Sequence, residues 1–260
     1  MRAIHHIMFR SPSEEQMASF AEAGVEVRRV LTIAEDDPRW TKVALLIERF
    51  KLRDVVTTEH SDSDQDAAGV LTMLATDQHG YPEPAMDGSY LPATFDLAEH
   101  CRFCGIGRRQ SAPFRLKKTP ALGKSILQLN WIFDEYFVNP DTFKTVFRPS
   151  GVDCRPVVLN KTGAEIDSVV QLSIPQIIDL RTDGLAYKEC SHCGRRKYSH
   201  TFLREGPCPA PTEIVASIFK SNQYFGDGAR AFRLVLISGL LHRGIKAARL
   251  SGVRFIPCAE

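Results

Sequence analysis

The spacing of apolar and polar residues predicts a chain that is rich in short strands. Residues 154–159 and 167–174 are strand-like and flank the turn signal Lys161-Thr-Gly163, so they predict a β-hairpin. Shorter apolar or β-branched runs predict further strands. These cover residues 3–10, 25–33, 55–58, 125–131, 233–237 and 253–256.

Apolar residues at helical spacing predict short helices between these strands. Ser11-Pro-Ser-Glu14 has the form of a capping box, and the helix that it begins ends at Gly24. A second helix follows Asp37-Pro38, and a third covers residues 140–147. Ser238 caps a fourth helix near the C-terminus. The residues expected to face inward from this last helix are Leu240, Leu241 and Ile245.

Together these elements predict an α+β fold, in which a mixed sheet is flanked by helices. The acidic segment of residues 59–66 is predicted to be an exposed loop. Residues 77–92 hold three prolines and two glycines and form the best boundary in the chain. We therefore expect an N-terminal α/β part over residues 1–95 and a second α+β domain, which contains the cysteine motifs, over residues 96–260.

The composition is that of an ordinary soluble domain. The chain has 260 residues, of which 43% are hydrophobic and 25% are charged, and this is enough to bury a sizeable core. The net charge of +2 is too small to argue for a polyanionic partner by itself. No signal peptide and no run of about 18 apolar residues is found, so we expect a cytoplasmic protein without membrane association.

Two CxxCG boxes carry the strongest chemical signal. They are Cys101-Arg-Phe-Cys104-Gly and Cys190-Ser-His-Cys193-Gly. Two thiolates at this spacing chelate one face of a metal ion, and the glycine lets the chain turn back so that backbone amides point at the sulfurs. Two such zinc knuckles complete a tetrahedral site. We therefore expect one structural Zn²⁺ ion bound by Cys101, Cys104, Cys190 and Cys193.

Other interpretations of the boxes are open. A redox pair needs a cysteine at a helix N-terminus, and neither box is followed by a good helix start. A catalytic zinc would need an open position, with His100 or His192 replacing a cysteine. One or both pairs could also pack without any metal. Of the remaining cysteines, Cys154 and Cys258 are expected in the core and Cys208 in an exposed loop.

Basic residues follow both boxes and suggest an alternative function in nucleic-acid binding. Phe114 and Tyr198 lie among these residues, and such a mixture would suit a phosphate backbone and a stacked base. Charge that keeps exposed turns soluble and offsets the thiolates is a simpler explanation. The basic residues are Arg108, Arg109, Arg115, Lys117 and Lys118 after the first box, and Arg195, Arg196 and Lys197 after the second.

No arrangement of residues predicts an active site. The sequence lacks the common motifs of serine hydrolases, P-loop proteins, zinc proteases and dinucleotide-binding enzymes. Asp134 and Glu135 are adjacent, so in regular structure their side chains would point in different directions and would not form a carboxylate dyad. We therefore expect a protein that is not an enzyme.

The paired boxes, a long β-rich insert and the closing motif Leu250-Ser-Gly-Val-Arg-Phe255 resemble the double-CxxCG-motif proteins of bacteria. The resemblance covers roughly residues 95–260. In such proteins the final strand, helix and strand end in Gly-Val-x-Phe, which Gly252 to Phe255 match. They are grouped with immunity proteins of polymorphic toxin systems. The resemblance implies a protein that binds a cognate toxin domain and neutralises it without catalysis.

Overall fold

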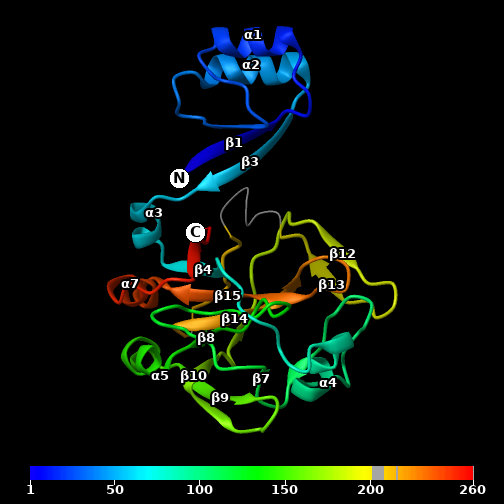
Figure 1. Ribbon diagram of the computed structural model, residues 1–260, viewed down its shortest axis with the longest axis vertical. Coiled ribbons are helices and arrows are strands. Elements are labelled where there is room, and N and C mark those ends of the chain that lie inside the picture. Colours follow the sequence, from blue (N-terminus) through cyan, green and yellow to red (C-terminus); the bar gives the residue numbers. More distant parts are fainter. Residues whose placement is uncertain (201–207, 215, 260) are drawn as a thin grey trace. The chain divides into compact units, whose positions relative to one another are not determined.

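The computed structural model describes residues 1–200, 208–214 and 216–259, which form two compact units (Figure 1). Residues 1–64 belong to the first unit, and the described residues from Gln65 onward belong to the second. The division thus falls at residue 64, whereas the prolines and glycines of residues 77–92 suggested a division near residue 95. The reason is β4 (Val70–Ala75), which pairs with strands close to the C-terminus and so ties residues 65–95 to the second unit.

The N-terminal unit is a three-stranded antiparallel sheet with two helices. Its strands are β1 (Arg2–Met8), β2 (Val30–Ala34) and β3 (Arg53–Glu59), in the order β2-β1-β3, and its helices are α1 (Glu14–Glu22) and α2 (Trp40–Phe50). Ile7 from the central strand, Phe20 from α1 and Val43 from α2 are fully buried in one core. The predicted alternation of strands and helices is therefore confirmed in this unit.

The capping box of α1 lies two residues later than predicted. Ser13 is the N-cap: its hydroxyl accepts a hydrogen bond from the Gln16 backbone N–H at 3.1 Å, and its own N–H donates to Gln16 Oε1 at 2.9 Å. The segment predicted to be an acidic loop holds the end of β3 and the start of a short helix, α3 (Asp62–Ala67). Residues in this segment are already paired, since Glu59 contacts Arg2 and Asp64 contacts the N-terminal amine.

A seven-stranded mixed sheet organises the C-terminal unit. Its strands run in the order β12-β13-β14-β15-β4-β16, and β11 pairs with β14. The pairs β13–β14 and β11–β14 are parallel and the others are antiparallel. The bounds are β11 (Ile177–Ile178), β12 (Tyr187–Glu189), β13 (Arg196–Tyr198), β14 (Ile218–Phe225), β15 (Phe232–Ser238) and β16 (Val253–Pro257).

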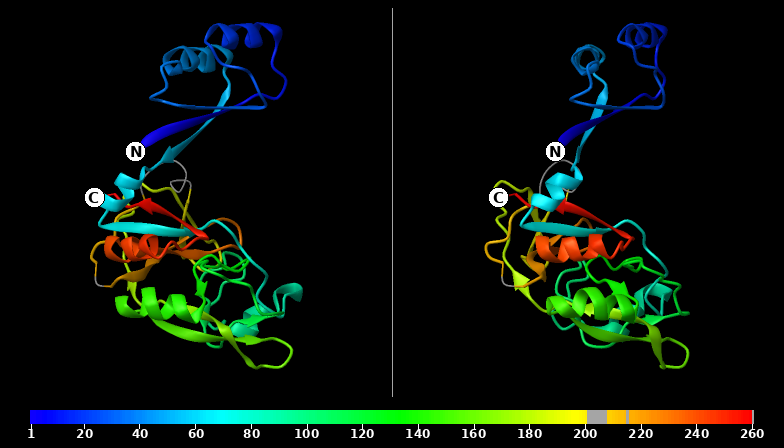
Figure 2. Two further views of the ribbon diagram at one scale, coloured as in Figure 1. Left: turned by 60° about the vertical axis from the view of Figure 1, so that its left-hand side comes forward. Right: turned by 90° about the vertical axis from the view of Figure 1, so that its left-hand side faces the viewer.

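The predicted strand–helix–strand ending is confirmed. Helix α7 (Gly239–Ala247) connects β15 to β16, and these strands pair with opposite edges of β4. The Ser238 hydroxyl accepts the Leu241 N–H at 3.3 Å and caps the helix, which lies against the sheet (Figure 2). Leu241 and Ile245 are buried, but Leu240 is 70% exposed, so the prediction that it faces inward is wrong. Leu240 lies about 100° around the helix from Leu241.

A second sheet, in the order β7-β9-β10-β8, contains the predicted hairpin. Strands β9 (Asp153–Leu159) and β10 (Glu165–Ser173) are antiparallel, and β7 (Arg115–Leu116) and β8 (Phe137–Val138) flank them. Tyr136 joins this layer to the large sheet, because its buried hydroxyl donates to the Met73 carbonyl at 2.7 Å. Residues 125–131 were predicted as a strand but make only isolated bridges, such as Leu127 with Phe137.

The remaining elements are short. Strands β5 (Phe95–Asp96) and β6 (Arg109–Gln110) form a two-stranded ribbon, preceded by the 3₁₀ turn η1 (Met86–Gly88) and α4 (Tyr90–Thr94). The helix predicted over residues 140–147 is α5 (Pro140–Thr142), followed by the π-helical turn η2 (Phe143–Phe147) and the 3₁₀ turn η3 (Arg148–Ser150). Among the described residues, no helix combines the length and the apolar character that crossing a bilayer requires.

Candidate metal centre

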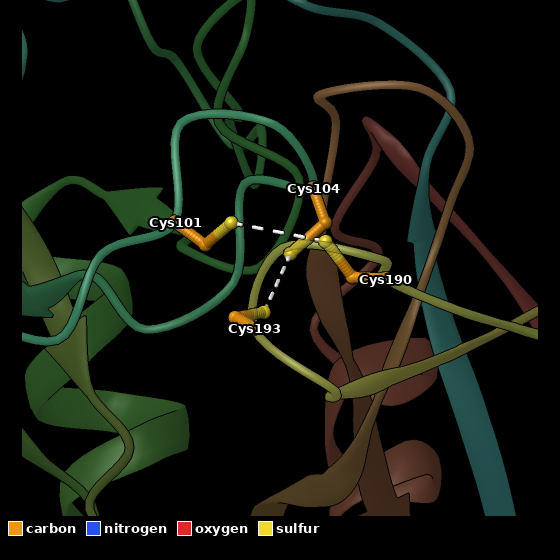
Figure 3. A group of neighbouring side chains, drawn as sticks. All are labelled: Cys101, Cys104, Cys190 and Cys193. Atoms are coloured by element: carbon orange, nitrogen blue, oxygen red, sulfur yellow. Dashed lines mark hydrogen bonds between the residues drawn. The ribbon is translucent and has the colours of Figure 1, made fainter.

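The two cysteine boxes meet in space, as Figure 3 shows. The Sγ atoms of Cys101 and Cys190 lie 3.9 Å apart, and those of Cys104 and Cys193 lie 3.7 Å apart. All four sulfurs lie within 4.8 Å of one another. A tetrahedral ion with metal–sulfur bonds of about 2.3 Å would hold its sulfurs about 3.8 Å apart. Two of the sulfur–sulfur distances match this spacing and the others do not exceed 4.8 Å, so the four thiols could hold a single metal ion.

Each box sits between two strands that pair with each other. The first connects β5 to β6, and the second connects β12 to β13. Both pairs are antiparallel, so each box forms the tip of a small β-ribbon. Cys101 and Cys190 are 89 positions apart in the chain, and the whole second sheet lies between them in the sequence. The fold, and not local sequence, brings the two ribbons together.

The same backbone turn is built in both boxes. In the first, the Gly105 N–H donates to the Cys101 carbonyl at 2.7 Å, and in the second the Gly194 N–H donates to the Cys190 carbonyl at 2.8 Å. Both glycines have positive φ, 79° and 69°. A side chain disfavours this backbone conformation, which explains the glycine that follows each second cysteine.

Two basic residues that follow the second box connect it to the first. Arg195 donates through Nε to Cys193 Sγ at 3.4 Å and through its terminal nitrogen to the Glu99 carbonyl at 2.6 Å. Lys197 is buried, and its ammonium donates to the carbonyls of Cys104, Gly228 and Arg230. These cations join the two boxes and offset the negative charge that thiolates would place there. The sequence showed these residues only as part of a basic run.

The surroundings of the thiols act differently on their pKa values. The Arg195 side chain lowers the pKa of Cys193 to about 6, and the backbone N–H of Cys104 lowers the pKa of Cys101. Burial, by contrast, raises the pKa of Cys104 to about 12. A bound cation would favour the thiolate at every position, because metal binding displaces the thiol proton. The centre thus has the donors and the charge balance to hold a metal ion.

The histidines beside the boxes lie outside the sulfur cluster. Among the described residues, no histidine or carboxylate joins the group formed by the four cysteines. His192 is exposed and stacks on Phe103, with ring centroids 3.4 Å apart and planes 9° from parallel. His100 is half-buried, and burial lowers its pKa. This arrangement gives no support to an open catalytic site with a histidine ligand.

Two of the other three cysteines do not lie where the sequence suggested. Cys154 was expected in the core but is exposed, because β9 enters the core only from Val157 onward. Cys208 was expected in an exposed loop but is fully buried, since its N–H bonds to the Pro257 carbonyl beside the last strand. Cys258 lies opposite Cys208 in an isolated bridge and is partly buried. Burial raises the pKa of both thiols.

Several basic residues considered for nucleic-acid binding are engaged inside the protein. Arg108 lies over the Phe95 ring and close to Asp134, at 3.6 Å. Phe114 is fully buried, so no nucleobase can stack on it. The exposed members of the two runs are Arg109, Lys117, Lys118 and Arg196.

Comparisons with protein families, with curated proteins and with solved structures found no match for the chain.

Proposed function

We propose that this protein is a non-enzymatic binding protein whose four-cysteine centre holds a structural zinc ion. The convergence of Cys101, Cys104, Cys190 and Cys193 within 4.8 Å of one another is the observation that carries the proposal. Four thiolates fill the coordination shell of Zn²⁺ and leave no position for substrate, which is typical of structural and not of catalytic zinc.

The position of the centre supports a structural role. The ion would clamp the β5–β6 ribbon to the β12–β13 ribbon, two segments that share no strand pairing. Zinc binding would then stabilise the C-terminal unit.

The closing motif of the sequence leads into β16, an edge strand of the large sheet in this unit. In that motif Gly252 has a φ of 85°, and a Cβ there would lie 2.3 Å from the Ile126 carbonyl oxygen. Close packing against the Ile126 carbonyl therefore explains why glycine occupies the first position of Gly-Val-x-Phe.

For the biological role, we propose neutralisation of a toxin domain by direct binding. The paired boxes and the closing motif, which resemble bacterial double-CxxCG-motif proteins, support this role. Neutralisation by binding needs a shape- and charge-complementary surface and no catalytic group. The acidic side chains of residues 59–66 are poor candidates for that surface, because Asp66 pairs with Lys246 at 2.8 Å and Glu59 and Asp64 are also paired.

Co-expression tests this role. The partner to try is the toxin domain at the C-terminus of a secreted protein encoded immediately upstream of this gene. Expression of the chain should restore growth to cells that make the domain, and the two proteins should elute together in size-exclusion chromatography. A chain that carries Cys101→Ser and Cys190→Ser should lose this protection. Continued killing by the neighbouring toxin in the presence of folded, zinc-loaded protein would reject the toxin role and leave the zinc assignment intact.

One observation favours nucleic-acid binding as a second candidate function. Phe103 is 48% exposed at the tip of the first box, stacks on His192, and has the Arg102 guanidinium 5.0 Å from its ring. An exposed aromatic stack with a cation beside it is a surface on which a nucleobase can stack.

A gel shift at several salt concentrations distinguishes this candidate. If the stack binds single-stranded nucleic acid, Phe103→Ala and Arg102→Gln should each weaken binding by about tenfold. Arg28→Gln, in the N-terminal unit, should leave it unchanged. Absence of a shift at low salt would exclude this candidate.

A further inference from the structure

A cavity of about 610 Å³ lies beside the cysteine centre, within the C-terminal unit. Its wall is formed by the segment after the first box, by β10 and the residues that follow it, and by β14 and β15. Three residues that follow the cysteine boxes also line this cavity. They are Ile106, Gly107 and Arg195. The size is within the range of small-molecule sites.

Basic side chains outnumber acidic ones around this cavity. The acidic residues are Glu99, Asp134 and Glu135. The basic residues are Arg108, Arg109, Arg155, Arg195, Lys220 and Arg233. Six cations in a partly enclosed space create a positive potential, because the protein walls screen charge less than water does. The cavity lining thus carries three more positive than negative groups, which exceeds the net charge of +2 of the whole chain.

Part of this charge is neutralised in place. The Lys220 ammonium bonds to the Glu135 carboxylate, whose second oxygen accepts the Gln171 side-chain amide at 3.0 Å. Asp134 faces Arg108 at 3.6 Å and accepts the Arg233 backbone N–H at 3.2 Å. The adjacent carboxylates thus pair with separate cations, and these paired groups are part of the cavity lining.

Arg109 and Arg155 are different. In the described part of the chain, neither guanidinium has a hydrogen-bond or ion-pair partner. Arg155 on β9 lies directly opposite Gln171 on β10, so the two side chains share a face of the sheet. Gln171 is 1% exposed and also exchanges two hydrogen bonds with Gln110, the neighbour of Arg109. Arg155 therefore lies beside this buried network, and Arg109 lies one position from it along β6, while both arginines remain exposed to solvent.

The rest of the lining mixes polar residues, such as Gln110 and Ser173, with apolar ones. The apolar members are Phe95, Ile106, Leu172 and Ile174, and the Phe95 ring centroid lies 5.1 Å from the Arg108 guanidinium. A ligand that fills the cavity would need anionic groups for the arginines and an apolar or planar part for this wall. Guanidinium forks suit phosphate, because each can donate two parallel hydrogen bonds to its oxygens.

We propose that this cavity binds a small organic phosphate, with at least two negative charges and a planar or apolar group, through Arg109 and Arg155. The four thiols do not line the cavity, and the proposal does not depend on toxin neutralisation. The ligand class follows from two guanidiniums that have no partner among the described residues, from the paired charges beside them and from the apolar side chains in the lining.

Isothermal titration calorimetry of the full-length, metal-loaded protein with ADP as the probe tests the site. ADP should bind with an affinity that falls as salt is raised, and adenosine should not bind. Arg109→Gln and Arg155→Gln should each weaken ADP binding by at least about tenfold, since each removes charge-assisted hydrogen bonds. Arg181→Gln, which alters an exposed arginine outside the cavity, should leave the affinity within about twofold.

Three results would overturn the proposal. They are no heat from ADP at low salt, equal ADP affinity in the wild type and both cavity variants, and tighter binding of citrate than of ADP. Binding of a short single-stranded oligonucleotide without any binding of ADP would also contradict it, in favour of the exposed stack at Phe103. Neither variant removes a hydrogen bond or ion pair to a described residue, so unchanged melting temperatures should accompany the expected loss of affinity.

Discussion

At the scale of single residues, the two box glycines have the same conformation and different surroundings. A Cβ on Gly105 would lie 2.1 Å from the Ala229 carbonyl oxygen, whereas a Cβ on Gly194 would have no atom within 4 Å. Positive φ alone therefore explains Gly194. Close approach of the neighbouring backbone is an additional constraint on Gly105.

This difference predicts unequal costs for the same substitution. Gly194→Ala should lower the free energy of unfolding by about 1 kcal/mol, the cost of a side chain at positive φ. Gly105→Ala should lower it by about 1–3 kcal/mol more, because backbone atoms must move. Urea unfolding of the metal-loaded variants measures both values. Equal losses would show that the β5–β6 ribbon does not pack against residues 229–231 as described.

Thiol reactivity should follow burial and metal binding. In the native, metal-loaded protein Cys154 should be the first thiol to react with a thiol reagent at about pH 8, because it is exposed. Burial raises its pKa, but burial raises the pKa values of Cys208 and Cys258 further, and the four box cysteines are bound. Cys154→Ser should abolish this first phase. A strong chelator should then release the box cysteines to the reagent. Rapid reaction of several thiols before chelation would contradict the bound state of the boxes.

Alkaline pH should destabilise the protein through its buried thiols. Burial raises the pKa of Cys208 and raises that of Cys258 to about 12, whereas in the unfolded chain both titrate near pH 9. Above pH 9 the unfolded chain releases these protons and the folded chain keeps them. Stability is therefore complete below pH 9 and falls as the pH rises toward 12, by up to about 1.4 kcal/mol per pH unit for each thiol.

Cys208→Ala should reduce this slope. Urea unfolding of the wild type and the variant at pH 7.5 and pH 10 gives the comparison. The cavity left by the substitution lowers stability at both pH values and cancels from the difference. Identical pH dependence in the two proteins would mean that Cys208 titrates normally in the folded state.

At the scale of elements, the sequence predicted the helices and hairpins whose signals lie within one short segment, but not the pairing of strands that are distant in the chain. The β9–β10 hairpin was predictable because a turn signal separates two strand-like runs. The start of α1 was misplaced because Ser11 with Glu14 and Ser13 with Gln16 both match the capping motif, and only the structure shows that the helix begins at Glu14. The place of β4 between β15 and β16 depends on contacts between distant segments, which no local pattern encodes.

Helix α7 allows a matched test of which of its faces is buried. Leu241 is 2% exposed and Leu240 is 70% exposed. Leu241→Ala should destabilise the protein by about 2–5 kcal/mol through lost burial and a cavity. Leu240→Ala should change stability by less than about 0.5 kcal/mol. Similar thermal shifts for both variants would mean that the helix is rotated relative to the sheet.

At the scale of the whole molecule, the clustering of the four box cysteines was predictable and the lining of the cavity beside them was not. The spacing within the two CxxCG boxes is typical of metal-binding cysteines. Cys101, Cys104, Cys190 and Cys193 could therefore be selected as candidate metal ligands before the fold was known. The cavity draws its cations from positions between Arg108 and Arg233, in segments that only the sheets bring together. Sequence reasoning also missed the position of Asp134 and Glu135. It argued only that the two carboxylates would not act as a pair, and the structure places both residues in the cavity lining.

X-ray absorption at the zinc edge, combined with metal analysis of the purified full-length protein, tests the central claim most directly. The account predicts one zinc ion per chain, surrounded by four sulfur atoms at about 2.3 Å. It also predicts loss of this signal in a variant that combines Cys101→Ser with Cys190→Ser. Substoichiometric zinc, or a spectrum that requires nitrogen or oxygen ligands in the wild type, would contradict a closed four-thiolate centre.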